Sequence, residues 1–89
     1  MEFEWDSGKS ASNQRKHGIS FESAVNVFLD PNRQEWPDVR HDYGEARWIT
    51  TGMVESWEVV ICYTMRGKTI RLISARKAAR REREDYWSR

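Results

Sequence analysis

The stretch of residues 57–74, WEVVICYTMRGKTIRLIS, decides the fold. From Trp57 to Met65 every second residue is apolar or aromatic, which is the period of a β-strand that buries one face. A second apolar run follows at 68–74, and Arg66-Gly67 separates the two runs. Because glycine adopts the positive φ that a tight turn needs, the stretch predicts a β-hairpin with antiparallel strands.

Segments on both sides of this hairpin extend the pattern. Residues 2–5, EFEW, alternate polar with aromatic side chains and predict a strand whose two aromatic residues are buried. Asp6 and Ser20 are good N-cap residues, and Gly18 suits the end of a helix. The elements expected outside the hairpin are strands at 2–5 and 46–53, helices at 7–17, 21–30 and 75–87 with Ser74 as N-cap of the last, and a short edge strand around 34–36.

The order β-α-α-β-β-β-α indicates an α+β fold, a small antiparallel sheet with flanking helices. The chain has the length of one small domain, so residues 1–89 are expected to form a single domain. Cys62 is the only cysteine and forms neither an internal disulfide nor a zinc cluster, a usage typical of intracellular proteins. The acidic start, and the lack of an apolar run of about 20 residues, predict a cytoplasmic protein without a membrane segment.

Charge is divided unevenly along the chain. Residues 1–65 carry six Lys/Arg against eleven Asp/Glu, a net charge of −5, whereas residues 66–89 carry nine against three, a net charge of +6. A basic end on an acidic domain suggests a polyanion such as RNA, an acidic segment of a partner protein, or both. The alternative is a solvated helix face with no ligand.

Several classes of chemistry have no motif in this sequence. The five glycines are isolated, so there is no phosphate-binding loop, and the patterns GxSxG, CxxC and HExxH are absent. His17 and His41 do not lie at metal-ligand spacing on one element. We therefore expect neither a cofactor nor a metal site.

The remaining polar residues suit cleavage of RNA without a metal ion. In that reaction a base takes the proton of the ribose 2′-OH, cations offset the charge of the phosphorane, and an acid protonates the leaving 5′-oxygen. His17 titrates near neutral pH in its unperturbed state and is a candidate base or acid, with Lys16 or Glu45 as substitutes. Candidate phosphate ligands are Arg66, Arg71, Arg76 and Arg80, and candidate platforms for an unpaired base are Trp87, Tyr63 and Trp48.

Most of these residues also have a structural interpretation. A histidine beside a C-terminal glycine, as at His17, complements the helix dipole. Tyr63 lies in the apolar stripe of a strand, and Glu45 is placed to pair with Arg47. Arg76 differs, because it follows the first residue of the expected last helix, where a cation opposes the dipole. That unfavourable placement suggests a bound anion.

The residues considered as a set resemble the BrnT toxin family of bacterial type II toxin-antitoxin systems. The motifs that carry the resemblance are FEWD at 3–6, Lys9, Asn13, KHGISFE at 16–22, Ala24, Phe28, Asp30, GEAR at 44–47, Gly52, Tyr63, Arg66, ISAR at 73–76, Glu82-Arg83 and Tyr86. They extend over nearly the whole chain. Ser23 stands where the family commonly has a glutamate, which removes the capping-box partner of Ser20.

The resemblance implies a RelE-like fold and a ribonuclease that blocks translation. It also implies a BrnA-like antitoxin that neutralises the toxin in a hetero-oligomer and alone contacts operator DNA, and an RNA substrate, free or on the ribosome. An alternative function is a non-catalytic module that binds the antitoxin and tunes operon repression. The expected catalytic residues are His17, Lys16, Arg66 and Arg76, the expected RNA-binding residues are Lys9, Arg71, Arg80, Arg83 and Trp87, and no metal ligand is expected.

Overall fold

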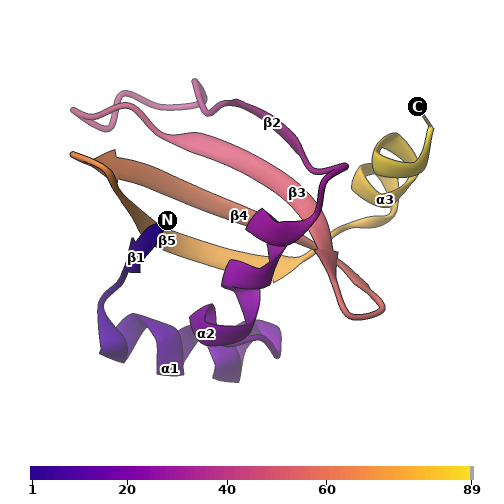
Figure 1. The fold of residues 1–89 in the computed structure, drawn as a ribbon, viewed down its shortest axis with the longest axis horizontal. Helices are drawn as coiled ribbons and strands as arrows, with labels where there is room; N and C mark the ends of the chain where they lie inside the picture. The colour runs from indigo at the N-terminus through magenta and orange to yellow at the C-terminus, as the bar shows by residue number, and fades with distance from the viewer. Residues whose placement is uncertain (89) are drawn as a thin grey trace.

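Residues 1–88, the part of the chain that the computed structural model describes, form a five-stranded sheet with helices, so the predicted α+β class is confirmed (Figure 1). The predicted edge strand is present and adds one strand to the expected order. The elements are β1 (Glu2–Glu4), α1 (Ser7–His17), α2 (Phe21–Ala24), the 3₁₀ helix η1 (Val25–Leu29), β2 (Gln34–Pro37), β3 (Trp48–Val54), β4 (Trp57–Arg66), β5 (Thr69–Lys77) and α3 (Arg80–Trp87).

The strands follow the order β1-β5-β4-β3-β2 in the sheet. Strands β2 to β5 pair antiparallel with their neighbours in sequence, and the predicted hairpin is the β4–β5 pair. Its turn lies at Gly67 and the next residue, with Gly67 at φ 60°, one position later than predicted. Strand β1 instead pairs parallel with β5, so the sheet is mostly antiparallel.

The last third of the chain corrects one prediction. A helix was expected from Ala75, but β5 continues to Lys77 and α3 begins only at Arg80. Residues 75–77 pair with β4 from Val59 to Ile61, and the side chain of Ala75 is fully buried. Pairing and burial thus override the helix propensity of this alanine- and arginine-rich run. Consequently Ala79, and not Ser74, is the N-cap residue of α3.

The hydrophobic core lies between one face of the sheet and the helical segment formed by α2 and η1 (Figure 1). Phe21 on α2, Ile61 on β4 and Leu72 on β5 are among its most completely buried residues. The helix ends follow the predicted caps. Asp6 accepts a hydrogen bond from the backbone N–H of Lys9 at 3.0 Å, and the other two caps are Gly18 at φ 76° and Ser20, which accepts from the N–H of Ser23.

Asn13 connects α1 to strand β5 through side-chain hydrogen bonds. Its side-chain amide donates to the backbone carbonyls of Ile19 and Ala75 at 2.9 and 2.7 Å, and its carbonyl accepts from the N–H of Ala75 at 3.3 Å. Helical spacing places Asn13 on one polar face of α1 with Lys9. Lys9 is exposed, whereas Asn13 is buried.

The second face of the sheet is here called the open face, because α1 and α2 do not cover it. Successive strand residues point to opposite faces, so the core positions Val59 and Ile61 place Val60 and Cys62 on the open face. The segment 38–47 and α3 contribute to this side. None of the helices in residues 1–88 combines the length and the apolar character that crossing a membrane would need.

Candidate functional site

A cleft of about 260 Å³ lies on the open face of the sheet. Its floor comes from β3, β4 and β5, and its rim comes from β2, the segment 38–47 and α3. It is here called the open-face cleft, and its lining residues are Trp36, Arg40, Ile49, Val60, Cys62, Ser74, Arg76 and Glu82.

Arg76 on β5 meets Glu82 on α3 in this cleft. The guanidinium donates to both carboxylate oxygens of Glu82, at 2.6 and 2.8 Å, in the bidentate geometry that makes such pairs strong. Glu82 also accepts the backbone N–H of Ala79 at 2.8 Å, which satisfies one donor of the first turn of α3. The hydrogen bonds from Arg76 lower the pKa of Glu82, and those to Glu82 raise the pKa of Arg76.

Arg40 makes the second bidentate pair, with Asp38. Both nitrogen–oxygen distances are 2.8 Å, and the hydroxyl of Tyr43 donates to the same carboxylate at 3.1 Å. Asp38 is only 6% exposed, and its hydrogen bonds with Arg40 hold its pKa well below the usual range of a carboxyl. Burial raises the pKa of the neighbouring thiol of Cys62. The buried carboxylate therefore fixes Arg40 at the rim.

The two guanidinium groups give the cleft its chemical character. Arg40 and Arg76 both line the cleft, where the charge of Arg40 partly offsets the rise in the pKa of Arg76 that Glu82 causes, and they lie over neutral side chains of β3 and β4. Planar guanidinium groups bind phosphate oxygens in the same bidentate fashion as carboxylates. Trp36 on the rim is 41% exposed and offers an aromatic surface to an unpaired base. The arrangement suits a phosphodiester of single-stranded RNA.

The four expected catalytic residues do not come together in one place. Arg76 lies in the open-face cleft, within a strand and not at the helix N-terminus from which its role was inferred. Lys16 and His17 are in the last turn of α1, on the side of the sheet that the helices cover. Arg66 ends β4 beside the start of β5, roughly 20 Å from Arg76 at about 3.3 Å per residue.

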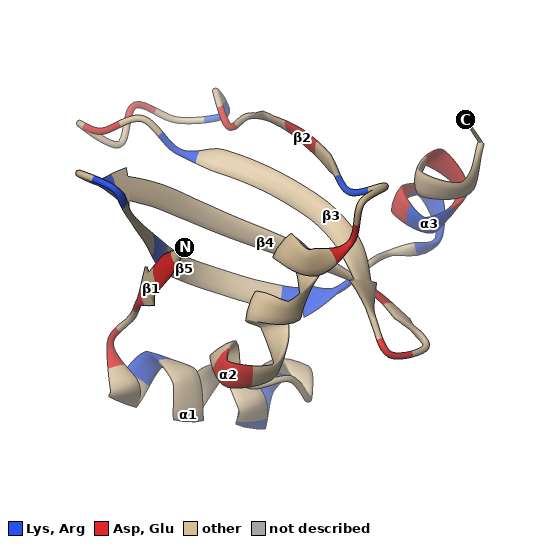
Figure 2. Cartoon of the chain, in the orientation of Figure 1, with Lys and Arg blue, Asp and Glu red and all other residues tan. Residues whose placement is uncertain are grey.

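The expected RNA-binding residues are mostly engaged with other parts of the protein. Figure 2 shows acidic and basic residues close together along α3, as expected for a solvated helix face. Lys9 is exposed in the first turn of α1. The observed partners are Glu4 for Arg71 at 2.6 Å, Glu84 for Arg80 at 3.1 Å, the carbonyl of Ala78 for Arg83 at 3.0 Å and Glu58 for Trp87 at 2.7 Å.

Two structural interpretations from the sequence, those of Tyr63 and Glu45, are confirmed. Tyr63 is buried in the core and donates its hydroxyl to Glu35. Glu45 pairs with Arg47 at 3.1 Å. Trp48, a candidate platform for a base, is half-buried and packs against the core.

Sequence reasoning missed Arg40, Trp36 and Glu82 as parts of the cleft. Arg40 lies in an irregular segment without periodicity, and only its spacing of two residues from Asp38 hints at a local ion pair. Glu82 falls within the helix expected at 75–87, and nothing in its local pattern shows that β5 places Arg76 opposite it. Across residues 1–88, no three His, Cys, Asp or Glu side chains gather where they could hold a metal ion.

The comparison with protein families gives one match, and no curated protein matches the chain significantly. The family model describes the ribonuclease toxin, BrnT, of type II toxin-antitoxin systems, and it matches residues 5–82. The matched range includes the pair Arg76–Glu82 and the whole sheet from β2 to β5. The chain therefore belongs to the BrnT family of ribonuclease toxins, which act on RNA and have a cognate antitoxin.

Proposed function

We propose that this toxin cleaves RNA in the open-face cleft without a metal ion, with the ribose 2′-OH as the nucleophile. The 2′-oxygen attacks the adjacent phosphorus as it loses its proton, and the bond from phosphorus to the 5′-oxygen breaks. The leaving 5′-oxygen takes up a proton, so the products are a 2′,3′-cyclic phosphate and a 5′-hydroxyl. The convergence of Arg40 and Arg76 over a neutral sheet surface is the observation that carries this proposal.

Arg40 and Arg76 have the role of stabilising the phosphorane. Preorganised donors aimed at developing charge commonly make the largest single contribution to such reactions. Both side chains are already fixed by carboxylates, so little conformational freedom is lost when phosphate oxygens replace those partners.

Glu82 is the proposed base for the 2′-OH. Its pKa is lowered mainly by the hydrogen bonds from Arg76, so a phosphate that engages Arg76 removes this influence and makes the carboxylate more basic. Substrate binding thereby prepares the base. His17, Lys16 and Arg66 lie outside the cleft and have the role of contacting the rest of the RNA chain.

Cleavage by the purified, antitoxin-free protein tests the role of Arg76. We expect Arg76→Ala to lower the single-turnover rate constant by about 100-fold or more, the range found for removal of an oxyanion donor. Arg80→Ala is the matched control, because Arg80 also pairs with a glutamate but is exposed on α3. We expect it to cleave within about threefold of wild type, and EDTA to leave the wild-type rate unchanged.

Two outcomes would contradict the proposal. One is wild-type cleavage by Arg76→Ala at full rate with folding confirmed by circular dichroism. The other is loss of activity in EDTA with recovery on addition of Mg²⁺. End-group analysis of the products separates the 2′-OH mechanism from hydrolysis, since hydrolysis leaves no cyclic phosphate.

Cleavage of RNA in the cytoplasm would inhibit translation, on free or ribosome-bound message. The partner we propose is a BrnA-like antitoxin that covers the cleft in a hetero-oligomer and brings operator DNA to the complex. Acidic antitoxin residues are the natural competitors for Arg40 and Arg76, because carboxylates hold both already. Expression of the toxin alone should stop growth, and co-expression of the antitoxin should restore it.

One observation favours a second function, a non-catalytic module that binds the antitoxin and tunes operon repression. In the free protein the guanidinium groups of Arg40 and Arg76 are both occupied by carboxylates. In a non-catalytic module these two arginines would remain paired with Asp38 and Glu82. Intact RNA at high protein concentration, with tight antitoxin binding, would support this second function.

A further inference from the structure

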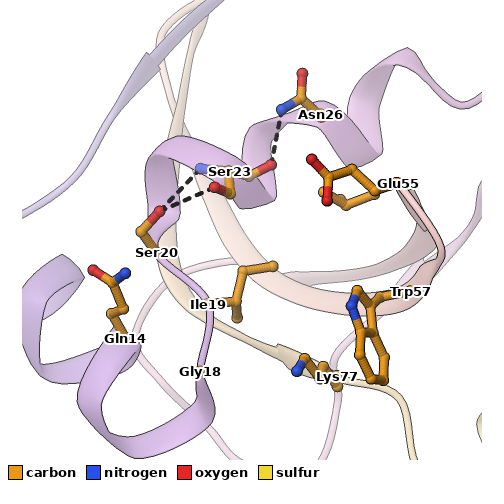
Figure 3. A pocket seen from close by; sticks show the side chains of 10 residues that line it. Gln14, Gly18, Ile19, Ser20, Ser23, Asn26, Glu55, Trp57 and Lys77 are labelled. Atoms are coloured by element: carbon orange, nitrogen blue, oxygen red, sulfur yellow. Dashed lines mark hydrogen bonds between the residues drawn. The ribbon is translucent and has the colours of Figure 1, made fainter.

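A second cavity, of about 250 Å³, lies on the opposite side of the sheet from the cleft. It is open to solvent on one side and is lined by the end of α1, by α2 and η1, by the turn between β3 and β4 and by the end of β5. Figure 3 shows Glu55 and Trp57 on one side of it and Gln14 and Ser20 on the other, with Lys77 below. Its lining includes the core residues Ile19 and Val54. The proposed cleavage reaction does not use this cavity.

An aromatic ring and a cation define one wall of the cavity. The ammonium of Lys77 lies 3.8 Å from the ring centroid of Trp57, a cation–π contact that holds both side chains in place. Trp57 is nevertheless 51% exposed, so much of the indole is free for a second planar group. A base that stacks on such a ring gains affinity regardless of sequence.

The carboxylate of Glu55 has no hydrogen-bond or ion-pair partner among residues 1–88. Glu55 also has φ 54°, in a two-residue turn where asparagine or glycine is favoured. A strained, unpaired carboxylate on a cavity wall indicates a role for its oxygens. Those oxygens accept N–H groups and repel phosphate, so they favour the edge of a base.

Positive charge lies next to the cavity as well as within it. The last turn of α1 carries Arg15, Lys16 and His17, and Gly18, the residue that follows, lines the cavity. A Cβ on Gly18 would lie 3.7 Å from the ammonium of Lys77, so the basic turn and the lysine are neighbours. Cations beside an aromatic pocket are the pattern of sites for single-stranded nucleic acid.

We propose that this cavity binds an unpaired guanine of the RNA substrate, away from the cleavage cleft. Guanine presents N1–H and its 2-amino group side by side, which match the two oxygens of Glu55, and its O6 accepts from Lys77. Adenine lacks the N1–H donor. The cavity exceeds the roughly 150 Å³ that holds a benzene molecule, so a two-ring base fits. The inference rests on RNA as the substrate of the proposed function.

Equilibrium binding of short single-stranded RNA tests the assignment. The probes are 2′-O-methyl hexanucleotides, which cannot be cleaved through the 2′-oxygen, with one guanine, inosine or adenine in an otherwise uridine chain. We expect guanine to bind about tenfold or more tighter than adenine, with inosine between them because it lacks the 2-amino group. Fluorescence anisotropy of a 5′ label gives the dissociation constants.

Substitutions of cavity residues test whether the preference for guanine over adenine arises in this cavity. Trp57→Ala and Glu55→Gln should remove the guanine preference. Glu55→Gly should also remove it while raising thermal stability, because glycine relieves the strain at positive φ. Lys68→Ala, at the exposed β4–β5 turn, is the control and should retain the preference.

Equal binding of guanine and adenine by wild type would overturn the inference, as would an unchanged preference in Trp57→Ala and Glu55→Gln. Variants that bind RNA normally but no longer bind the antitoxin would assign the cavity to protein contacts and also overturn it. Cleavage of unmodified RNA is measured in parallel. Absence of cleavage with the guanine preference intact would contradict the cleft proposal alone.

Discussion

At the scale of single residues, the side chain of Asn13 makes the backbone hydrogen bonds to β5 that a neighbouring strand would make. Strand β1 ends at Glu4, opposite Arg71, so the outer edge of β5 has no strand beside it at Ala75. The Asn13 amide supplies both a donor and an acceptor to that backbone. Edge groups that are buried and unpaired would otherwise be costly.

Replacement of Asn13 by alanine should destabilise the protein by about 2 kcal/mol or more, since each buried group left without a partner costs about 1–3 kcal/mol. Urea unfolding followed by circular dichroism gives the free energy. Ser12→Ala, at an exposed position of α1, is the control and should stay within about 0.5 kcal/mol of wild type. A similarly small change for Asn13→Ala would mean that its hydrogen bonds are not needed for stability.

Asp38 predicts how stability responds to acid. Its pKa is lower in the folded protein than the value of about 3.9 expected for an unfolded chain, because Arg40 stabilises the charged form. Such a group stabilises the fold above its unfolded pKa, and the stabilisation is lost as pH falls through the folded pKa. The free energy of unfolding should therefore decrease below about pH 4.

Asp38→Asn should flatten this decrease, because it removes the titrating carboxylate. Urea midpoints measured between pH 2 and 5 give the slope for each variant. Asp42→Asn, which changes an exposed carboxylate of the same segment, controls for the loss of one negative charge. An Asp38→Asn slope equal to that of wild type would contradict a linked role of the Asp38–Arg40 pair.

At the scale of elements, the sequence predicted those whose periodicity and caps agree with one another. Helix α1 has Asp6 and Gly18 at its ends and matches its expected bounds. The β4–β5 hairpin was predicted because apolar alternation and a glycine turn coincide. The junction of β5 and α3 was not, because residues 75–79 favour a helix locally while pairing with β4 keeps most of them extended.

The candidate site was predictable only in part for the same reason. Arg76 was identified, but through a helix position that it does not occupy. Its partner Glu82 and its neighbour Arg40 come from a separate helix and an irregular segment. Tertiary packing brings these three residues together in the cleft. Local sequence patterns do not predict tertiary packing.

The N-terminus of helix α3 lacks a side-chain cap, which can be tested by substitution. Ala79 occupies the N-cap position with extended backbone angles, φ −74° and ψ 167°, but has no side-chain acceptor. Ala79→Ser should complete a capping box with Glu82 and stabilise α3 by about 0.5–2 kcal/mol. Hydrogen exchange of the α3 amides measures the effect.

The control for this change is Ala11→Ser at an exposed position inside α1. It introduces the same side chain where no cap exists, and it should cost a few tenths of a kcal/mol. If Ala79→Ser also lowers protection of the α3 amides, the N-terminus of α3 does not lie at Ala79.

At the scale of the whole molecule, the basic end of the sequence is less available to RNA than its net charge suggests. Arg71, Arg76 and Arg80 each pair with a glutamate, so the RNA must compete with these carboxylates. Folding also brings Glu4, from the acidic part of the sequence, onto Arg71 of the basic part, because β1 pairs with β5. This ion pair neutralises some of the positive charge of residues 66–89.

Salt dependence reports how many phosphates the folded protein contacts. For single strands, log affinity should fall with log salt by about 0.7 for each phosphate neutralised. We expect Lys16→Ala, in the basic last turn of α1, to reduce the slope by about 0.7. Arg80→Ala is the matched control and should leave the slope unchanged, since Arg80 lines neither the open-face cleft nor the guanine cavity. A flat response in wild type would assign the basic residues to protein contacts instead.

The parallel pairing of β1 with β5 also sets an order of events during synthesis. Glu4 and Arg71, which meet across this pair, are 67 residues apart in the chain. Strand β1 is synthesised first but can pair only after β5 has been synthesised. Contacts of such long range form slowly. The same strand β5 delivers Arg76 to the cleft. A chain interrupted before β5 lacks both the partner strand of β1 and Arg76, so on the proposed mechanism ribonuclease activity would arise only when synthesis is nearly finished.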